Sequence, residues 1–364
     1  MATVTHTTRY DAVVRTREFV MEISSWIPFS LGRKSTTRQK KRSLGRGNLS
    51  TRQIVLHIGR PKTGTSSLQK FLTSNEDFLF ENKIIYPSDP LLYRYPKHGE
   101  FVRLLERVQR DGALITDIKE VSRSLAMILE DYFDRARTII ISAEGLQNLD
   151  PYLVAEAFGN YIDDVVVVCY LREQVSHFAS SYNQEIHSSL CDQTVSDFFY
   201  NRPRANYKAF TLAWSRAFPQ IRFRVYAKNN LLSGDVVKDF CHEILGVAPP
   251  AYNLDGNISL NRALLAWKLE YNRRVNRGEM LKILPQYDLY RKLQKLASAD
   301  PQGQRFVTPK DLAENIKLVA EPDNESIEGL LENGTLQLSD GGPSDPLIIT
   351  EREFSLITDQ IMRP

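Results

Sequence analysis

Four short apolar runs recur along the chain and are separated by stretches with helical spacing. The runs are 54–58, 138–142, 165–171 and 221–226. Each is short and rich in β-branched or aromatic residues, which predicts a β-strand. In the last run, apolar side chains alternate with Arg222 and Arg224, which favours a position nearer the edge of a sheet.

Apolar residues spaced three and four apart predict helices between and after these runs. The predicted helices are 65–73, 101–109, 118–133, 175–186, 207–218, 236–245 and 260–274. Strands that alternate with helices predict an α/β fold whose central parallel sheet is covered on both faces. After about residue 335 the sequence becomes loop-like, so we expect one domain at 52–335 between an N-terminal tail, 1–51, and a C-terminal extension, 336–364.

The composition is that of an ordinary globular protein, with 42% apolar and 25% charged residues among 364. This excludes a wholly disordered, collagenous or coiled-coil chain. Residues 1–50 have a net charge of +7. The whole chain has a net charge of +3, so the remaining residues carry −4. We expect the basic segment to be a solvated tail, with contact to nucleic acid, contact to an anionic membrane and an organellar targeting segment as the alternatives.

Cysteine content and hydropathy set the expected location. Three scattered cysteines are too few for a disulfide framework or a zinc cluster, which favours a reducing compartment. No run reaches the roughly 18–20 apolar residues that a membrane span needs. We therefore predict a cytoplasmic protein without a transmembrane segment, and expect no nucleic-acid partner for the folded part.

The turn after the first run carries the first candidate site. Its sequence is Gly59-Arg60-Pro61-Lys62-Thr63-Gly64-Thr65-Ser66-Ser67. A strand, a glycine-bearing loop and a helix start direct free N–H groups and the helix dipole at an anion. The spacing is close to the nucleotide-binding P-loop, but Thr65 stands where that motif has lysine, and Lys62 lies within the loop instead. Ordinary ATP or GTP hydrolysis is therefore not expected.

The end of the third run carries the second candidate site. Arg172 directly follows the run, at the end of a strand where open α/β sheets bind ligands. A guanidinium at this place can hold a phosphate group with two hydrogen bonds. Ser180 follows about two helical turns later and can add a hydroxyl on the same side. Two separate phosphate-binding groups on one sheet suit a ligand with phosphates at both ends.

These two sites together resemble those of the sulfotransferases that use 3′-phosphoadenosine 5′-phosphosulfate (PAPS). The residues that carry the resemblance are Pro61-Lys62-Thr63-Gly64-Thr65-Ser66-Ser67-Leu68, and Tyr170-Leu171-Arg172 followed by Ser180-Ser181-Tyr182. Segments 224–226 and 257–261 agree more loosely, and the resemblance covers roughly 52–330. Gln174 departs from the family, which usually has proline two residues after the arginine.

The resemblance implies a P-loop-like three-layer α/β/α fold and the binding of PAPS without a metal. The residues implied to cradle the 5′-phosphosulfate are Lys62, Thr63, Gly64, Thr65 and Ser66. Arg172 and Ser180 are implied to hold the 3′-phosphate. The implied reaction is an in-line displacement in which an acceptor hydroxyl attacks sulfur while Lys62 stabilises the charge on the departing oxygen.

A general base is needed to take the acceptor proton. Glu144 is the first candidate, because it follows the second run and would open towards the same strand ends; its alternative role is a carboxylate at a helix N-terminus. His98, in a loop before a helix, is the second candidate, and a surface loop histidine is its alternative. His57 is expected in the core and His177 on a helix face.

Two other function classes stay open at this point. One is a kinase-like phosphotransferase that uses ATP, and the other is a non-catalytic nucleotide-binding protein. The acceptor can be a carbohydrate, a lipid or a small alcohol, and segments 84–115 and 270–310 are expected to shape its pocket. The sequence does not determine the oligomeric state.

Overall fold

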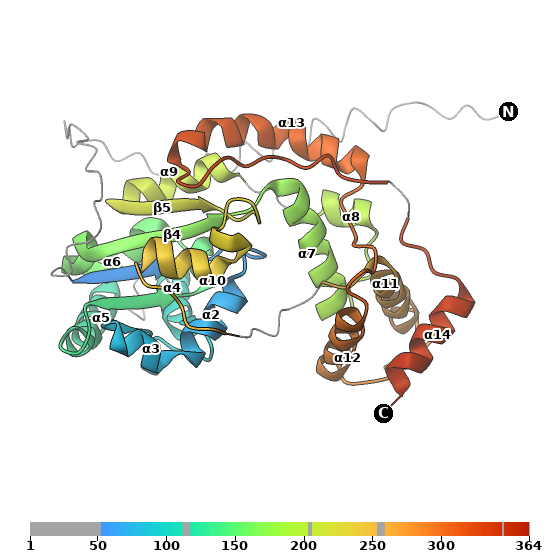
Figure 1. Cartoon of the computed structure of the whole chain (residues 1–364), viewed down its shortest axis with the longest axis horizontal. Coiled ribbons are helices and arrows are strands. Elements are labelled where there is room, and N and C mark those ends of the chain that lie inside the picture. Colours follow the sequence, from blue (N-terminus) through green and yellow to red (C-terminus); the bar gives the residue numbers. More distant parts are fainter. Residues whose placement is uncertain (1–51, 112–116, 203–205, 253–258, 344–345, 364) are drawn as a thin grey trace. The chain divides into compact units, whose positions relative to one another are not determined.

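A parallel five-stranded sheet forms the centre of the computed structural model (Figure 1). The structure describes residues 52–111, 117–202, 206–252, 259–343 and 346–363. The strands are β1 (Gln53–His57), β2 (Ile84–Ile85), β3 (Thr138–Ser142), β4 (Val165–Leu171) and β5 (Gln220–Val225). Their order is β2-β3-β1-β4-β5, and every neighbouring pair is parallel. The four predicted strands and the edge position of β5 are confirmed.

Alternate side chains of the strands pack against helices on opposite faces of the sheet. Ile54 and Leu56 belong to a core with α4 (Gly99–Asp111), α5 (Ile118–Phe133), α6 (Pro151–Phe158) and α9 (Tyr207–Ala217). Val55 and Ile140 pack on the other face with α2 (Thr65–Ser74), α3 (Glu76–Glu81) and α10 (Val236–Asp239), which continues as a π-helix, Phe240–Ile244. The predicted α/β class with a sheet covered on both faces is confirmed. Short 3₁₀ segments connect these elements at Glu144–Asn148, Gly159–Asp164, Leu232–Gly234 and Glu328–Leu330.

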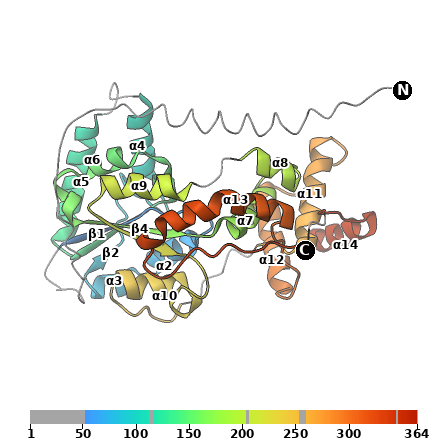
Figure 2. The ribbon, with the colours of Figure 1, turned by 90° about the horizontal axis from the view of Figure 1, so that it is seen from above.

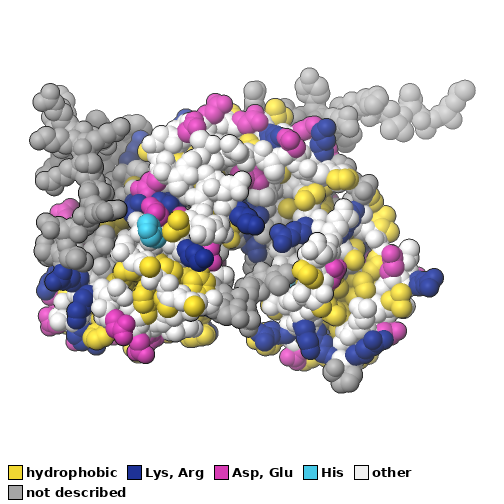
Figure 3. All heavy atoms as spheres, in the orientation of Figure 1, with side chains coloured by type: hydrophobic (Ala, Val, Ile, Leu, Met, Phe, Trp, Pro, Cys, Tyr) yellow, Lys and Arg dark blue, Asp and Glu magenta, His cyan; other side chains and the backbone are white. Residues whose placement is uncertain are grey.

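A second hydrophobic cluster is built mainly from helices and contains no strand of the sheet. It contains α7 (Gln174–Ser188), α11 (Arg262–Asn276), α12 (Gln286–Ala299) and α14 (Glu351–Met362) around the fully buried Trp267. Figures 1 and 2 show these helices gathered at one end of the sheet, and Figure 3 shows hydrophobic side chains exposed over the same part. Two further helices, α8 (Val195–Tyr200) and α13 (Lys310–Ile327), pack against α7.

The prediction of a loop-like chain after residue 335 is wrong for α14. Thr350 and Glu353 form a capping box that begins this helix, and Phe354 and Ile361 are buried. The Trp267 indole N–H donates hydrogen bonds to the Phe354 carbonyl (3.2 Å) and to Thr358 Oγ1 (3.1 Å). The segment therefore contributes to the helical cluster. A capping box is a local signal that the sequence already contained.

The predictions about a membrane span and about the basic tail have different outcomes. Within the described ranges, no helix combines the length and the hydropathy that a membrane crossing requires. The basic tail, 1–51, lies outside the described residues. The cytoplasmic location stays a prediction.

Candidate anion-binding site

The loop between β1 and α2 is packed so tightly that two of its positions accept only glycine. A Cβ atom on Gly59 would lie 2.2 Å from Thr65 Cγ2. Gly64 has a φ of +75°, in the left-handed region, and a Cβ there would lie 2.8 Å from Val236 Cγ1. Glycine is the residue that allows both the close approach and the positive φ. The loop is thereby held directly against the start of α2.

Lys62, in the middle of this loop, has a φ of +65°. This conformation is uncommon for a residue with a side chain, and such strained residues concentrate at functional sites. Two side chains hold the loop in place: Thr63 Oγ1 donates to the Arg60 carbonyl (2.6 Å), and Arg172 Nη1 donates to the Lys62 carbonyl (3.2 Å). Arg172 therefore joins the two sites that the sequence predicted separately.

The N-terminus of α2 has no capping side chain, because its N-cap residue is Gly64. The first N–H groups of a helix have no partner inside the helix, and the helix dipole makes them attractive to anions. In α7, by contrast, the Glu173 carboxylate accepts from the N–H groups of Val175 (2.8 Å) and Ser176 (2.6 Å). The start of α7 is thus satisfied by its own chain, while the start of α2 is open to a ligand.

Two half-buried cations, Lys62 just before this open helix start and Arg172 bonded to the Lys62 carbonyl, have no ion-pair partner among the described residues. In the described part of the chain, no carboxylate lies within 4.0 Å of Lys62 or Arg172. Burial lowers the pKa of both groups, and the neighbouring Arg172 lowers the pKa of Lys62 further, although Glu144 raises it. Partly buried like charges side by side need a counter-charge. Together with the uncapped helix, they form a site for an anionic group.

Glu144 lies beside the loop, at a position compatible with both of its predicted roles. It begins the 3₁₀ segment after β3 and accepts a hydrogen bond from Thr65 Oγ1. Burial raises the pKa of Glu144, and the nearby Lys97 and Lys62 lower it in part. A carboxylate with a raised pKa is a stronger proton acceptor than an ordinary glutamate. The structure thus brings Lys62, Thr65 and Glu144 together at one end of the sheet.

Thr65 is buried, with 3% of its surface exposed. It occupies the P-loop lysine position, and its hydroxyl is directed at Glu144 rather than at a ligand. Ser66 is exposed on the first turn of α2, next to the loop. Of the predicted loop residues, Lys62 and Ser66 are thus the more accessible, while Thr63 and Thr65 hold the loop from inside.

The residues around Arg172 differ in one respect from the prediction. Arg172 Nε donates to Ser176 Oγ (3.0 Å), a residue that the sequence analysis did not consider. Ser180 lies one turn further along α7, on the same side of the helix as Ser176. Residues i and i+4 of a helix share a face, and this rule would have identified Ser176 from the position of Ser180.

The candidate role of His98 as a base and its alternative as a surface loop histidine both require an accessible ring, and the structure contradicts this. The ring is fully buried, with Tyr86 and Tyr93 at centroid distances of 4.6 and 5.7 Å. Nδ1 accepts from the Ser142 N–H (3.0 Å), and Nε2 lies 3.0 Å from the Pro87 carbonyl, to which it donates as the other tautomeric nitrogen. Burial lowers the pKa of His98 to about 4. Both ring nitrogens are occupied, so we no longer consider His98 as a base. His57 is in the core, as expected.

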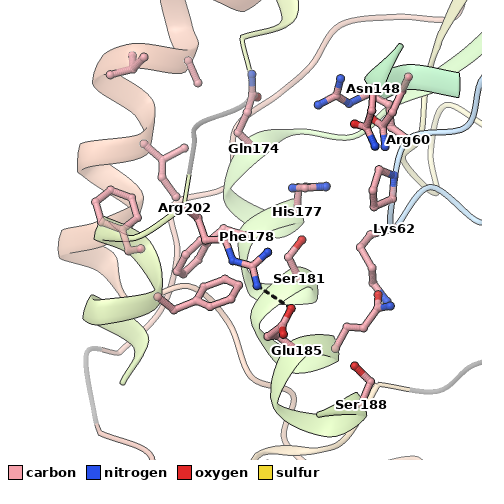
Figure 4. Close-up of a pocket in the computed structure, with 18 residues that line it drawn as sticks. Arg60, Lys62, Asn148, Gln174, His177, Phe178, Ser181, Glu185, Ser188 and Arg202 are labelled. Atoms are coloured by element: carbon pink, nitrogen blue, oxygen red, sulfur yellow. Dashed lines mark hydrogen bonds and ion pairs between the residues drawn. The ribbon is translucent and has the colours of Figure 1, made fainter. Parts of the chain in front are cut away.

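A cavity of about 490 Å³ opens beside Lys62 (Figure 4). It lies between the loop 60–62, the 3₁₀ segment after β3, and helices α7, α8 and α13. The described residues of the predicted acceptor segments, 84–115 and 270–310, do not line this cavity, and their role stays a prediction. Tyr86 instead packs around His98, and Tyr290 stacks on His187 at 4.1 Å.

Comparison with known proteins gives no assignment. No protein-family model matches the chain, and no curated protein matches it significantly. Function therefore has to be argued from the site.

Proposed function

We propose that the protein is a sulfotransferase that moves a sulfonate group from PAPS to the hydroxyl of an acceptor. One observation carries the proposal: Lys62, just before the uncapped start of α2, and Arg172, which donates to the Lys62 carbonyl, are both half-buried and have no ion-pair partner among the described residues. A donor with phosphate groups at both ends supplies the negative charge that this arrangement lacks. The P-loop-like fold and the family resemblance belong to the same proposal.

The loop supports this donor better than it supports ATP. A P-loop enzyme uses the lysine directly before its Ser or Thr to contact the β- and γ-phosphates. Here that position is Thr65, which is buried and donates to Glu144. The cation of the loop is Lys62, three residues before that position, and its backbone has the left-handed conformation. A single phosphosulfate group at the loop therefore fits better than a triphosphate.

Two sets of residues would bind the two ends of the donor. The loop residues Lys62 to Ser66 and the free N–H groups of α2 would hold the 5′-phosphosulfate. Arg172, with Ser176 and Ser180 on one face of α7, would hold the 3′-phosphate. When bound, the donor supplies the sulfonate, whose bond to the acceptor oxygen forms as its bond to the nucleotide phosphate oxygen breaks.

Lys62 and Glu144 then have complementary roles. Lys62 stabilises the negative charge that develops on the phosphate oxygen as it departs. Glu144 takes the proton of the acceptor hydroxyl, and its raised pKa suits that task near neutral pH. The Thr65 hydroxyl orients the Glu144 carboxylate through its hydrogen bond. We place the acceptor in the cavity beside Lys62, which Gln147 and Asn148 of the segment that begins at Glu144 also line.

Calorimetric titration with adenosine 3′,5′-bisphosphate, without magnesium, tests the donor site. We expect micromolar binding that weakens at least tenfold in Arg172→Ala, because the 3′-phosphate loses a charge-assisted hydrogen-bond partner. Arg222→Ala is the matched control. The Arg222 guanidinium forms an ion pair with Glu332 (2.7 Å) at the edge of the sheet, and its loss should leave the affinity unchanged.

Two results would replace the proposal. A preference for magnesium–ATP would favour the kinase-like alternative. Binding of adenosine 3′,5′-bisphosphate without sulfonate transfer to any hydroxyl compound, together with salt-dependent nucleic-acid binding, would favour the non-catalytic one.

A further inference from the structure

The cavity beside Lys62 has two chemically different walls. One wall is apolar: Phe178 lies 5.7 Å, between ring centroids, from both Phe198 and Phe199, and α13 adds Ile316, Val319 and Ala320. The opposite wall holds Arg60, Lys62, Gln147 and Asn148. Figure 4 shows Arg60, Lys62 and Asn148 across the cavity from Phe178 and Arg202. Most apolar side chains thus gather on one wall, beside the Arg202–Glu185 pair, while polar side chains line the opposite wall and part of α7.

Charge is divided between the walls in the same way. Arg202, beside the apolar wall, is neutralised by Glu185 at 2.6 Å and stacks over Phe198 at 4.7 Å. Arg60 stacks over Tyr207 and Phe210 at 5.0 and 4.7 Å, which fixes its position, and it has no ion pair with any described residue. The net positive charge of the cavity thus lies on the side of Lys62.

Helix α7 lines this cavity with one face and contacts Arg172 from another. Its residues His177, Ser181 and Ser188 line the cavity, whereas Ser176 and Ser180 face the side of Arg172. At about 100° per residue, Ser181 lies roughly 100° around the helix axis from Ser180. Lys62 contributes to both sides, because its carbonyl binds Arg172 and the residue lines the cavity. The cavity is therefore the place for the second substrate.

We infer that the acceptor is an amphipathic hydroxy compound, a polar head that carries the reacting hydroxyl joined to an apolar tail. The inference rests on the proposed function. The head lies on the polar wall next to Lys62, and the tail lies along Phe178, Phe199 and Val319. A saccharide with hydroxyls on all sides would leave some of them without partners against the apolar wall, at a cost in affinity. A volume of about 490 Å³ suits one such head and tail.

A series of alkyl β-glucosides tests the inference, because the head stays constant while the tail grows. Methyl, hexyl and octyl glucoside are titrated calorimetrically below their micelle concentrations, with and without saturating adenosine 3′,5′-bisphosphate. A buried methylene strengthens binding by up to about fourfold, so we expect at least a hundredfold gain from methyl to octyl. Equal affinity across the series would overturn the inference.

Two neighbouring substitutions on α13 show whether the tail binds in this cavity. Val319→Asp places a charge on the apolar wall at a half-exposed position (48%), so the fold tolerates it. It should weaken octyl glucoside at least tenfold and leave methyl glucoside unchanged. Leu318→Asp, at an exposed position (75%) that does not line the cavity, is the control and should change neither. Equal effects of the two variants would place the tail elsewhere and overturn the inference.

The same measurements distinguish a failure of the proposed function from a failure of this inference. Tail-dependent binding that Val319→Asp removes, in a protein that binds no adenosine 3′,5′-bisphosphate, would support an amphipathic ligand of this cavity and overturn only the sulfotransferase assignment. Sulfonate transfer from PAPS to octyl but not methyl glucoside would support both.

Discussion

Two groups of buried or half-buried cations in this protein differ in whether carboxylates pair with them. Arg224, on β5, is 4% exposed and pairs with Asp239 at 2.8 Å and Glu332 at 3.2 Å. The Tyr170 hydroxyl completes the shell by donating to Asp239 at 2.8 Å. Lys62 and Arg172, near the end of the neighbouring strands, have no carboxylate within ion-pair distance in the described ranges.

This difference suggests a stabilising role for the paired cation and a ligand-binding role for the unpaired ones. A buried charge with a full set of partners fixes the elements that carry those partners, here β5 and α10. A partly buried charge without a partner costs free energy of folding, and it becomes favourable only when a ligand supplies the opposite charge. Substitutions should therefore affect stability in the first group and binding or turnover in the second.

Lys62→Ala should give the largest effect, with kcat reduced about 1000-fold. The ammonium group acts on charge that develops during transfer, so the dissociation constant of adenosine 3′,5′-bisphosphate should change far less. Steady-state kinetics and calorimetry measure the two quantities, with Lys70→Ala on α2 as the control. Equal losses in kcat and affinity would mean that Lys62 only binds the donor.

Glu144→Gln should reduce kcat about 100-fold, because the amide cannot accept the acceptor proton but still accepts the hydrogen bond from Thr65. The base must be deprotonated, and burial raises its pKa, so the activity of the native protein should rise with pH through a pKa above that of ordinary glutamate. A pH–rate profile should lose this acid limb in the variant. An unchanged limb would assign the base to another residue.

Asp239→Asn should lower the free energy of unfolding by about 3 kcal/mol, because Arg224 loses its main partner while still buried. Chemical denaturation measures this loss, and Glu332→Gln, at a more exposed partner, should cost less. Affinity for adenosine 3′,5′-bisphosphate should stay the same. A weakened donor affinity in the folded variant would remove the distinction between the two groups.

Lys268 on α11 should give the smallest effect; it is fully buried, and no carboxylate of the described residues lies within 4.0 Å of its ammonium group. Burial lowers the pKa of Lys268 from 10.5 to about 7, and its Nζ donates to the Ser189 carbonyl at 2.7 Å. Between these two pKa values the unfolded chain binds the proton and the folded chain does not, so stability rises with pH and the penalty is complete below pH 7.

Lys268→Met should remove this pH dependence. From pH 7 to pH 8, the free energy of unfolding of the native chain should rise by about 1 kcal/mol relative to the variant. Denaturation curves at the two pH values measure the difference. A parallel change in both proteins would show that Lys268 keeps its charge when folded.

The sheet was predictable because β1, β3 and β4 are largely apolar runs and β5 alternates apolar residues with Arg222 and Arg224. Strands β3 and β4 were predicted with their observed bounds. The two-residue β2 was missed, since two residues carry no periodic pattern. Helix α13 was missed as well: its apolar residues are interrupted by charges, and Pro322 lies inside it.

The candidate site was predictable only where its residues are close in sequence. The loop around Lys62 is a local motif, and Arg172 is marked by its place after a strand. The error on His98 has a tertiary cause, since the Tyr86 and Tyr93 rings and the Ser142 N–H enclose it from other segments. The cavity was out of reach for the same reason: α13 lies more than 100 residues after α7 along the chain.

If the proposed function holds, the two faces of α7 allow the donor site and the acceptor site to change independently during evolution. The face with Ser176 adjoins the donor loop, while the face with Ser181 looks onto walls supplied by α8 and α13. Under the proposed function, substitutions at Phe199 or Val319 can retune the acceptor while Lys62 and Arg172 keep the donor. Diversification among descendants of such a gene should therefore concentrate on the distal wall, with the loop after β1 left constant.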